Sequence, residues 1–436
     1  MLRLLTALLL LAAPAWAEVE VQEVTSPGGI DAWLVEDHTL PFLALEIRFE
    51  GGSALEADGK RGAINLMTAT LEEGAADLDA TGFAEAREAL AASFEFDVYS
   101  DALSVSATML TENRDEAVAL LRTALTEPRF DQDAIDRVRG QVLSIIRSSA
   151  TDPQDIAGQA FSRAAFGDHP YGSDQDGTAE SVEALTRDDI VAAYEATIAR
   201  DRIYVGAAGD ITAEELGVLL DDLLGGLPEA GAPRPERAEI ALEPGVEVIE
   251  FDIPQSIILF GHEGISRDDD DYIAAYIVDT ALGGSGRQSR LMEEVRERRG
   301  LTYGIGTFLA PRELGDLYQG SVSTANANAG EVVEAVRAEF ARIAKEGLTA
   351  SELDEVKRFL TGGYPLRFDG NGSLASIMVG MQMVGLEPDY IARRNDIVDA
   401  LTLEEVNRVA AELVRPEDLS FVVVGRPEGL EATAAN

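Results

Sequence analysis

The chain has 436 residues, with 79 acidic side chains against 35 basic ones, a net charge of −44 and no cysteine. This charge argues against a nucleic-acid-binding face, which needs clustered Lys and Arg, and disfavours contact with an anionic membrane surface. The absence of cysteine excludes disulfides, thiolate nucleophiles and cysteine-based metal sites, and three histidines leave little material for a histidine-rich site. The length predicts about two or three domains. The acidic surplus is consistent with solubility alone or with attraction of basic partners.

Residues 1–17 have the pattern of a secretory signal peptide. Arg3 supplies a positive n-region, residues 4–17 form an apolar run, and Ala15 and Ala17 are the small residues of a cleavage site. The run is too short to span a bilayer comfortably, although an uncleaved anchor is the alternative. We therefore expect cleavage after Ala17, a periplasmic mature chain and no membrane attachment after cleavage.

Further along the chain, β-rich segments alternate with amphipathic helical stretches. Strands are predicted at residues 44–49 and around 94–108, and the alternation within 94–99 is typical of an edge strand. A helix is predicted at 114–125, and Asp131 stands where the next helix should be capped. Hairpin-like strand groups between helices favour α+β layers over a doubly wound parallel sheet.

The second half of the sequence repeats the first. Residues 185–209 and 401–425 align without a gap, and each reads as a capped helix followed by a short apolar strand that ends in glycine. Ser-Val-Ser recurs at 104–106 and 321–323, each time ahead of a helical stretch. The repeat therefore predicts two similar domains.

The boundary between the repeats lies in a segment rich in Pro, Gly, Ala and charge, GGLPEAGAPRPERAE. We expect an N-terminal domain at residues 18–228, an exposed linker at 229–244 and a C-terminal domain at 245–436.

The most specific local pattern is SRLMEEVRERRGLTYGIGT, at residues 289–307. It predicts a helix ended by Gly300 and then a strand. Arg296 and Tyr303 lie on either side of this turn, and a guanidinium and a phenol together can hold a peptide carbonyl or a developing oxyanion. The ordinary alternative is a salt-bridged arginine and a half-buried ring.

This segment, together with GGSALEADGKRGAINLMTATLEEGA (51–75) and FGDHPYGSDQDGT (166–178), resembles the M16 metallopeptidases, the insulinase or pitrilysin-like family, and their M16B group in particular. The resemblance covers nearly all of the mature chain. It implies two homologous tandem α+β domains of the LuxS/processing-peptidase (MPP-like) metallohydrolase type, arranged around a peptide-holding chamber.

The residues that bind zinc in active members of that family are missing here. The family's His-x-x-Glu-His motif falls on Asn65, Thr68 and Ala69, and its distal glutamate falls near residues 144–145, where there is no carboxylate. Alanine offers no ligand atom, and threonine is no general base near neutral pH. The degenerate N-terminal domain is therefore expected to bind no metal.

The three histidines, His38, His169 and His262, share no ligand spacing. We interpret them as structural rather than as a displaced zinc site.

The resemblance therefore implies a non-catalytic subunit that is inactive alone. It would pair with an HxxEH-bearing M16 subunit that carries the zinc, and would itself contribute Arg296 and Tyr303 to bind substrate carbonyls of peptides, basic ones included. No cofactor is expected in this chain and no nucleic-acid partner. The alternatives are a peptide-binding or chaperone-like scaffold without a peptidase role, and a self-sufficient enzyme with an unrecognised site.

Overall fold

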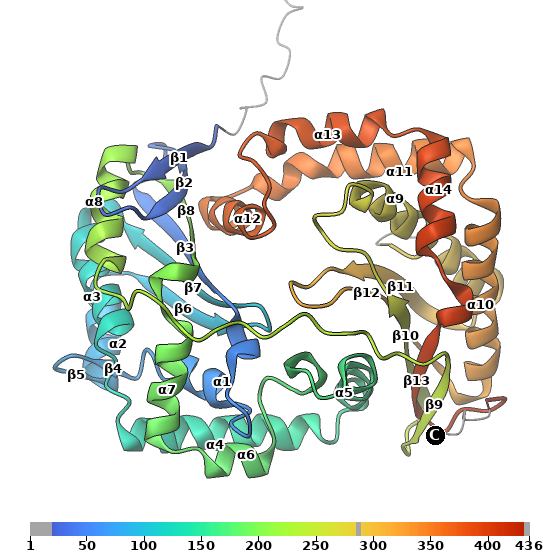
Figure 1. The fold of residues 1–436 in the computed structure, drawn as a ribbon, viewed down its shortest axis with the longest axis horizontal. Coiled ribbons are helices and arrows are strands. Elements are labelled where there is room, and N and C mark those ends of the chain that lie inside the picture. The colour runs from blue at the N-terminus through green and yellow to red at the C-terminus, as the bar shows by residue number, and fades with distance from the viewer. Residues whose placement is uncertain (1–19, 285–288, 431–436) are drawn as a thin grey trace, which may run out of the picture.

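A computed structural model describes residues 20–284 and 289–430 of the chain. The predicted signal peptide, residues 1–17, lies outside the described residues. Two mixed sheets organise the molecule, one in each half, and they face each other across its middle (Figure 1).

The N-terminal half holds a six-stranded sheet in the order β1-β2-β8-β3-β7-β6. Strands β2 and β8 are parallel, and the other neighbours are antiparallel. The pair β4 (Gly74–Ala75) and β5 (Leu78–Asp79) forms a separate short hairpin. The strands of the large sheet are β1 (Gln22–Thr25), β2 (Asp31–Glu36), β3 (Phe42–Glu50), β6 (Ser93–Val98), β7 (Ala102–Leu110) and β8 (Ile203–Gly209).

The C-terminal half repeats this pattern in a five-stranded sheet of order β11-β12-β10-β13-β9. Its single parallel pair, β9 with β13, corresponds to β2 with β8, and its remaining pairs are antiparallel in the same sequence. The strands are β9 (Gly245–Glu250), β10 (Gln255–Glu263), β11 (Thr302–Ala310), β12 (Leu317–Ala325) and β13 (Ser420–Gly425). This shared order, with β1 added in the first half, agrees with the predicted pair of homologous α+β domains.

Helices pack around both sheets, and two of them, α5 and α12, lie between the sheets (Figure 1). Those of the first half are α1 (Ala63–Thr68), α2 (Ala80–Ala89), α3 (Arg114–Thr126), α4 (Gln132–Ser149), α5 (Pro153–Phe166), α6 (Ala179–Ala184), α7 (Arg187–Thr197) and α8 (Ala213–Leu224). Those of the second half are α9 (Tyr272–Leu282), α10 (Ala329–Glu346), α11 (Ala350–Gly363), α12 (Asn371–Met383), α13 (Tyr390–Ala400) and α14 (Leu403–Leu413).

Matching caps start the matching helices. Thr186 and Thr402 each accept a hydrogen bond from the backbone three residues on, and the acid at that position bonds back to the cap. These capping boxes satisfy backbone donors that would otherwise be orphaned at the helix start. The aligned sequences therefore fold alike, as helix and then strand.

Each half lends one helix to the sheet of the other. Helix α5 of the first half packs on β10 and β13, while α12 of the second half packs on β8 and β3 (Figure 1). The fit is close: a Cβ on Gly206 of β8 would stand 2.4 Å from the Ala375 carbonyl oxygen, and one on Gly261 of β10 would stand 3.2 Å from the Phe161 ring. The two sheets are thus held together by exchanged helices as well as by the connecting segment.

Residues 229–244 form neither helix nor strand, as expected of a connection. They are largely exposed, but they are tied to both halves rather than free. Ala232 N donates to the Ala196 carbonyl of the first half, and Ala238 N donates to the Leu314 carbonyl of the second. Arg234 pairs with Glu50 of β3 and with Glu313 in the β11–β12 hairpin. The connection therefore fastens the two halves where they meet.

Among the residues that the structure describes, no helix combines the length and the apolar character needed to cross a membrane.

Candidate functional site

Helix α1 carries the positions at which the family's zinc motif falls, and their side chains are engaged in local structure. The Asn65 amide donates to Asp176 Oδ1 at 2.9 Å. The Thr68 hydroxyl is buried and donates to the Ile64 carbonyl at 2.8 Å, one helical turn back. Ala69 has no polar side-chain atom. No donor set for zinc therefore exists on this helix.

The expected position of the distal ligand is on α4, at residues 144–145. Ile145 is 53% exposed there, and neither residue has a carboxylate. Across residues 20–284 and 289–430, no three His, Asp or Glu side chains are grouped so that they could hold a metal ion. The residues present in this part of the chain do not fit a zinc ion.

Each histidine has local partners instead. His262 is buried, its Nδ1 lies 2.7 Å from the Glu263 carbonyl, and burial lowers its pKa to about 4. His169 caps a short 3-10 turn by accepting from Tyr171 N. His38 lies between Glu36 and Asp210, whose carboxylates raise its pKa. These contacts agree with a structural role for all three.

Arg296 and Tyr303 lie on consecutive elements of the C-terminal half. Arg296 sits on a π-helical segment, η5 (Met292–Arg298), rather than on a regular α-helix. Gly300 then turns the chain with φ of 65°, a conformation that glycine adopts without strain, and β11 begins at Thr302. Single π-helical turns are rare and often occur at functional sites.

The structure places the two side chains near the same turn but does not join them. Tyr303 is 90% exposed, and Arg296 lies 3.7 Å from Glu297 as a loose ion pair. No hydrogen bond connects Arg296 to Tyr303 in this part of the described chain. The Arg296 guanidinium and the Tyr303 hydroxyl therefore remain available to donate hydrogen bonds to a ligand. The alternative of a half-buried ring does not apply to Tyr303, because its side chain is exposed.

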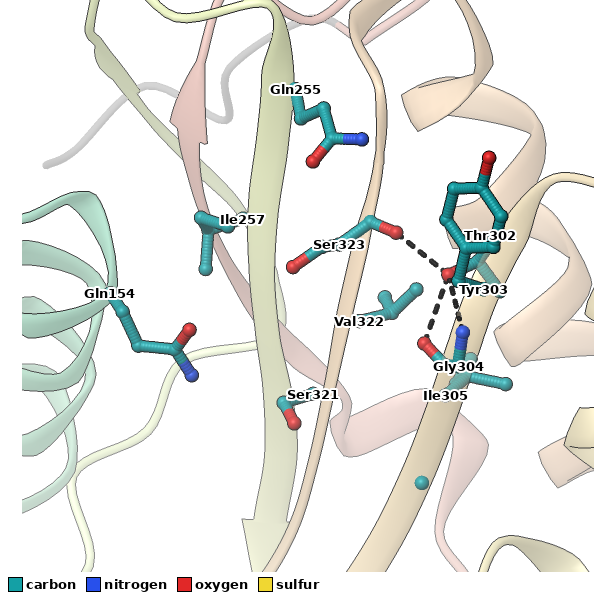
Figure 2. A pocket seen from close by; sticks show the side chains of 11 residues that line it. Gln154, Gln255, Ile257, Thr302, Tyr303, Gly304, Ile305, Ser321, Val322 and Ser323 are labelled. Atoms are coloured by element: carbon teal, nitrogen blue, oxygen red, sulfur yellow. Dashed lines mark hydrogen bonds between the residues drawn. The ribbon is translucent and has the colours of Figure 1, made fainter.

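Tyr303 borders a pocket of about 330 Å³ on the face of the C-terminal sheet. Figure 2 shows Gln154 of α5 approaching from one side and the strands β10, β12 and β11 forming the other. Thr302 is fixed at the rim because its hydroxyl bonds to the Ser323 and Gly304 carbonyls. The polar side chains of the lining are uncharged: Gln154, Gln255, Thr302, Tyr303, Ser321 and Ser323.

The N-terminal half has a pocket in the equivalent place, of about 370 Å³, between its sheet and the exchanged helix α12. Here the lining is charged. Glu46 is buried in β3 and accepts hydrogen bonds from Ser104, Ser106 and Arg48. The Arg48 guanidinium also donates to Ser376 of α12 at 2.9 Å.

Two further acids of this second pocket, Glu95 and Asp97, lie on β6. The sequence predicted an edge strand at residues 94–99, and β6 is indeed the last strand of its sheet. The sequence reasoning missed both pockets. The one feature of the sequence that could have indicated them is the Ser-Val-Ser repeat. Ser104 and Ser106 line the N-terminal pocket, and Ser321 and Ser323 line the C-terminal pocket.

Comparison with known proteins places the chain in a family. The family model described as Insulinase (Peptidase family M16) matches residues 32–178, and the one described as Peptidase M16 inactive domain matches residues 184–360. A Helicobacter pylori protein named non-peptidase homolog YmxG is 26% identical over 89% of this chain and 90% of its own length. An uncharacterized zinc protease of Mycobacterium leprae is 27% identical over 90% of this chain and 89% of its own.

Solved structures agree. A peptidase M16 inactive domain from Pseudomonas fluorescens superposes with a TM-score of 0.87 at 28% identity, covering 94% of this chain and all of that one. A protease from Helicobacter pylori superposes with a TM-score of 0.84 at 16% identity, over 93% of this chain and 100% of its own, which shows the fold. The chain belongs to the M16 peptidase family, as a non-catalytic member that lacks the HxxEH zinc motif.

Proposed function

We propose that this chain is the non-catalytic subunit of a periplasmic M16B zinc peptidase. It binds extended peptide between its two sheets and supplies Arg296 and Tyr303 to the active site of a partner subunit that carries HxxEH and the zinc. This chain provides binding and charge stabilisation, and the partner provides the metal chemistry.

The observation that carries the proposal is the exposure of Tyr303. A tyrosine that is 90% exposed contributes little to the core, yet this one lies on a strand at the rim of a pocket and beside a π-helical turn. A phenol and a nearby guanidinium can donate to the oxygen of a peptide carbonyl and stabilise the negative charge that develops there.

The sheet edges support peptide binding. Strands β6 and β11 are the outermost strands of their sheets at equivalent positions, and an extended peptide can pair with such an edge through main-chain hydrogen bonds. The acids beside β6, Glu46, Glu95 and Asp97, favour basic side chains in the bound peptide.

The decisive experiment is co-expression of the full chain with an HxxEH-bearing M16 chain of the same organism, followed by a zinc-dependent cleavage assay on an extended basic peptide. Tyr303→Phe and Arg296→Ala should each lower kcat by about 10²-fold, the usual effect of removing one oxyanion donor. Tyr303 is largely free of internal contacts, whereas the Arg296 side chain is 30% exposed, so thermal unfolding of each variant is measured beside its activity.

Arg298→Ala is the matched control. Arg298 lies on the same π-helical segment, is exposed and pairs with Glu293 and Glu294. Cleavage that is unchanged in both Tyr303→Phe and Arg296→Ala would remove the proposed role of the pair. Peptide binding by the isolated chain, with no cleavage in any pairing, would favour the scaffold function instead.

A further inference from the structure

A third pocket, of about 440 Å³, lies within the C-terminal half and apart from both sheet faces. It is enclosed by α9, α12, α13 and the 3-10 turn η7 (Tyr364–Phe368). In Figure 1, α13 runs along the upper edge of that half with α9 below it, and α12 lies between these two helices and the N-terminal sheet. Tyr303 does not line this pocket, so it is distinct from the site proposed above.

Three arginines line the pocket, and none forms an ion pair with any residue that the structure describes: Arg267, Arg367 and Arg394. No Asp or Glu belongs to the lining. This is unexpected in a chain with 79 acids and 35 bases, where a free arginine has many carboxylates to choose from. Positively charged guanidinium groups that face the same pocket repel each other, and an anion bound between them would offset this repulsion.

Arg394 is the most constrained of the three. It is only 5% exposed, and its Nη1 donates to the Leu360 carbonyl and to Asn395 Oδ1. Its Nε and Nη2 donate to no other residue in the described part of the chain. These two nitrogens are not fully shielded from solvent, so water or a ligand in the pocket can accept their hydrogen bonds.

Aromatic rings hold two of the guanidinium groups in place. Arg267 lies 4.3 Å over the Tyr272 ring and also reaches the Tyr390 hydroxyl at 3.3 Å, while Arg394 lies 4.6 Å over the Tyr364 ring. Such cation–π contacts orient the charge without neutralising it. Burial raises the pKa of Tyr364 to about 12, so its ring stays neutral and adds no counter-charge.

The rest of the lining is apolar and includes Phe368, Ile377 and Met381. The pocket therefore combines oriented positive charge with a surface that suits an aromatic or branched side chain. A phosphate or sulfate would use the charge and leave the apolar part in contact with water.

We propose that this pocket binds a carboxylate that carries an aromatic or branched apolar body. The guanidinium groups of Arg367 and Arg394 receive the carboxylate, and the tyrosines with the apolar lining receive the body. Two sources share this chemistry, the C-terminal residue of a peptide and a free aromatic acid.

The test is fluorescence anisotropy on the isolated full chain. The probes are a fluorescein-labelled pentapeptide that ends in phenylalanine with a free carboxylate, the same peptide amidated, and unlabelled N-acetyl-phenylalanine as competitor. The free-carboxylate peptide should bind at least tenfold more tightly than the amide, because a charge-assisted arginine–carboxylate contact is lost with the amide. Competition by N-acetyl-phenylalanine would identify the free acid as sufficient, and its absence would assign the site to peptide ends.

Arg367→Gln should weaken binding of the free-carboxylate peptide about tenfold. Arg367 is exposed and makes no hydrogen bond or ion pair within the described residues, so the fold does not depend on it. Arg393→Gln is the control, since Arg393 lies on the same helix α13 as Arg394 and pairs with Asp389 outside the lining. The free-carboxylate peptide and its amide offer the same main chain to the sheet edges, so the difference between their affinities reports on this pocket alone and separates the result from the fate of the proposed peptidase role.

Equal binding of acid and amide, no effect of Arg367→Gln, or displacement by inorganic phosphate as effective as by N-acetyl-phenylalanine would each overturn the proposal.

Discussion

The two sheet faces show how a repeated fold can carry different chemistry. On the N-terminal sheet Glu46 pairs with Gly206 and Ser106 in the ladders, and at the corresponding place on the C-terminal sheet Leu259 pairs with Val422 and Ser321. One pocket is therefore charged around a buried acid, while the polar groups of the other are uncharged.

The backbone explains why the ladder is kept while the side chains differ. Main-chain hydrogen bonds define strand order and register whatever the side chains are, provided that the buried face stays packed. Side chains that face a pocket are not bound by that requirement, so function can change there without loss of the fold.

The two exchanged helices, α5 and α12, also contact their sheets at different positions. Helix α12 approaches the N-terminal sheet at Gly206, whereas α5 approaches the C-terminal sheet at Gly261 and places Phe161 over it. Each glycine marks the place at which its sheet admits a helix from the other half.

The largest loss of stability in this comparison is expected from Gly206→Val. This substitution places in the N-terminal sheet the valine that the C-terminal sheet has at the corresponding position, Val422. The new side chain would collide with the Ala375 carbonyl and with Val379, and backbone atoms of α12 cannot move away cheaply. We expect a loss of about 3 kcal/mol in the free energy of unfolding, measured by urea denaturation.

Gly158→Ala is the control for that substitution. Gly158 lies within α5, the helix that corresponds to α12, and a Cβ added there would meet no atom within 4 Å apart from the backbone of its own helix and its chain neighbours. The free energy of unfolding of the Gly158→Ala variant should rise by about 0.5–1 kcal/mol, because alanine has a higher helix propensity than glycine. An equal, small effect of both substitutions would contradict the close seating of α12.

We expect an intermediate loss of stability from Glu46→Leu. This substitution gives the N-terminal sheet the leucine that the C-terminal sheet has at the corresponding position, Leu259. Ser104, Ser106 and Arg48 would lose their common acceptor, at a cost of about 2 kcal/mol. Glu46→Gln keeps the shape and one acceptor and should cost about half as much. Unchanged stability in both variants, measured by denaturation, would mean that the acid serves ligand binding and not the fold.

The smallest effect concerns the seam between the halves, where Glu313 lies near Glu50. Burial and the Glu50 charge raise the pKa of Glu313 to about 7. A raised carboxyl pKa favours the folded state below the unfolded value near 4.5, and this contribution is lost as pH rises through about 7. Glu313→Gln removes this buried charge but also one of the two ion pairs of Arg234, so it should stabilise the protein by only about 1 kcal/mol at pH 8 and by almost nothing at pH 5.

Thermal unfolding at the two pH values measures this difference, with Glu355→Gln on the exposed side of α11 as the control. A stabilisation of Glu313→Gln that is equal at pH 5 and pH 8 would show that the carboxyl is not protonated at the seam.

Much of the fold could be predicted from the sequence because its signals are local. The threonine caps at residues 186 and 402, the apolar periodicity of the helices and the glycine-ended strands all act within a few residues. The absence of the family's zinc ligands at Asn65, Thr68 and Ala69 could also be recognised from the sequence, because it depends only on the residue type at each position.

The candidate site was less predictable. Arg296 and Tyr303 were placed correctly at a helix end and on a strand, but the π-helical turn and the 90% exposure of the ring depend on how η5 and β11 meet. The pocket residues Gln154 and Ser321 come from different halves and share no sequence signal. The anchoring of residues 229–244 likewise depends on partners far away in the chain.

The sequence by itself determined the repeated elements, the family and the missing zinc ligands, because these depend on residue type and short-range spacing. Only the tertiary structure decided which helix covers which sheet, which pockets are charged and which arginines form no ion pair among the residues it describes. The physical reason is that burial, exposure and charge pairing are properties of the neighbours that folding brings together from distant parts of the chain.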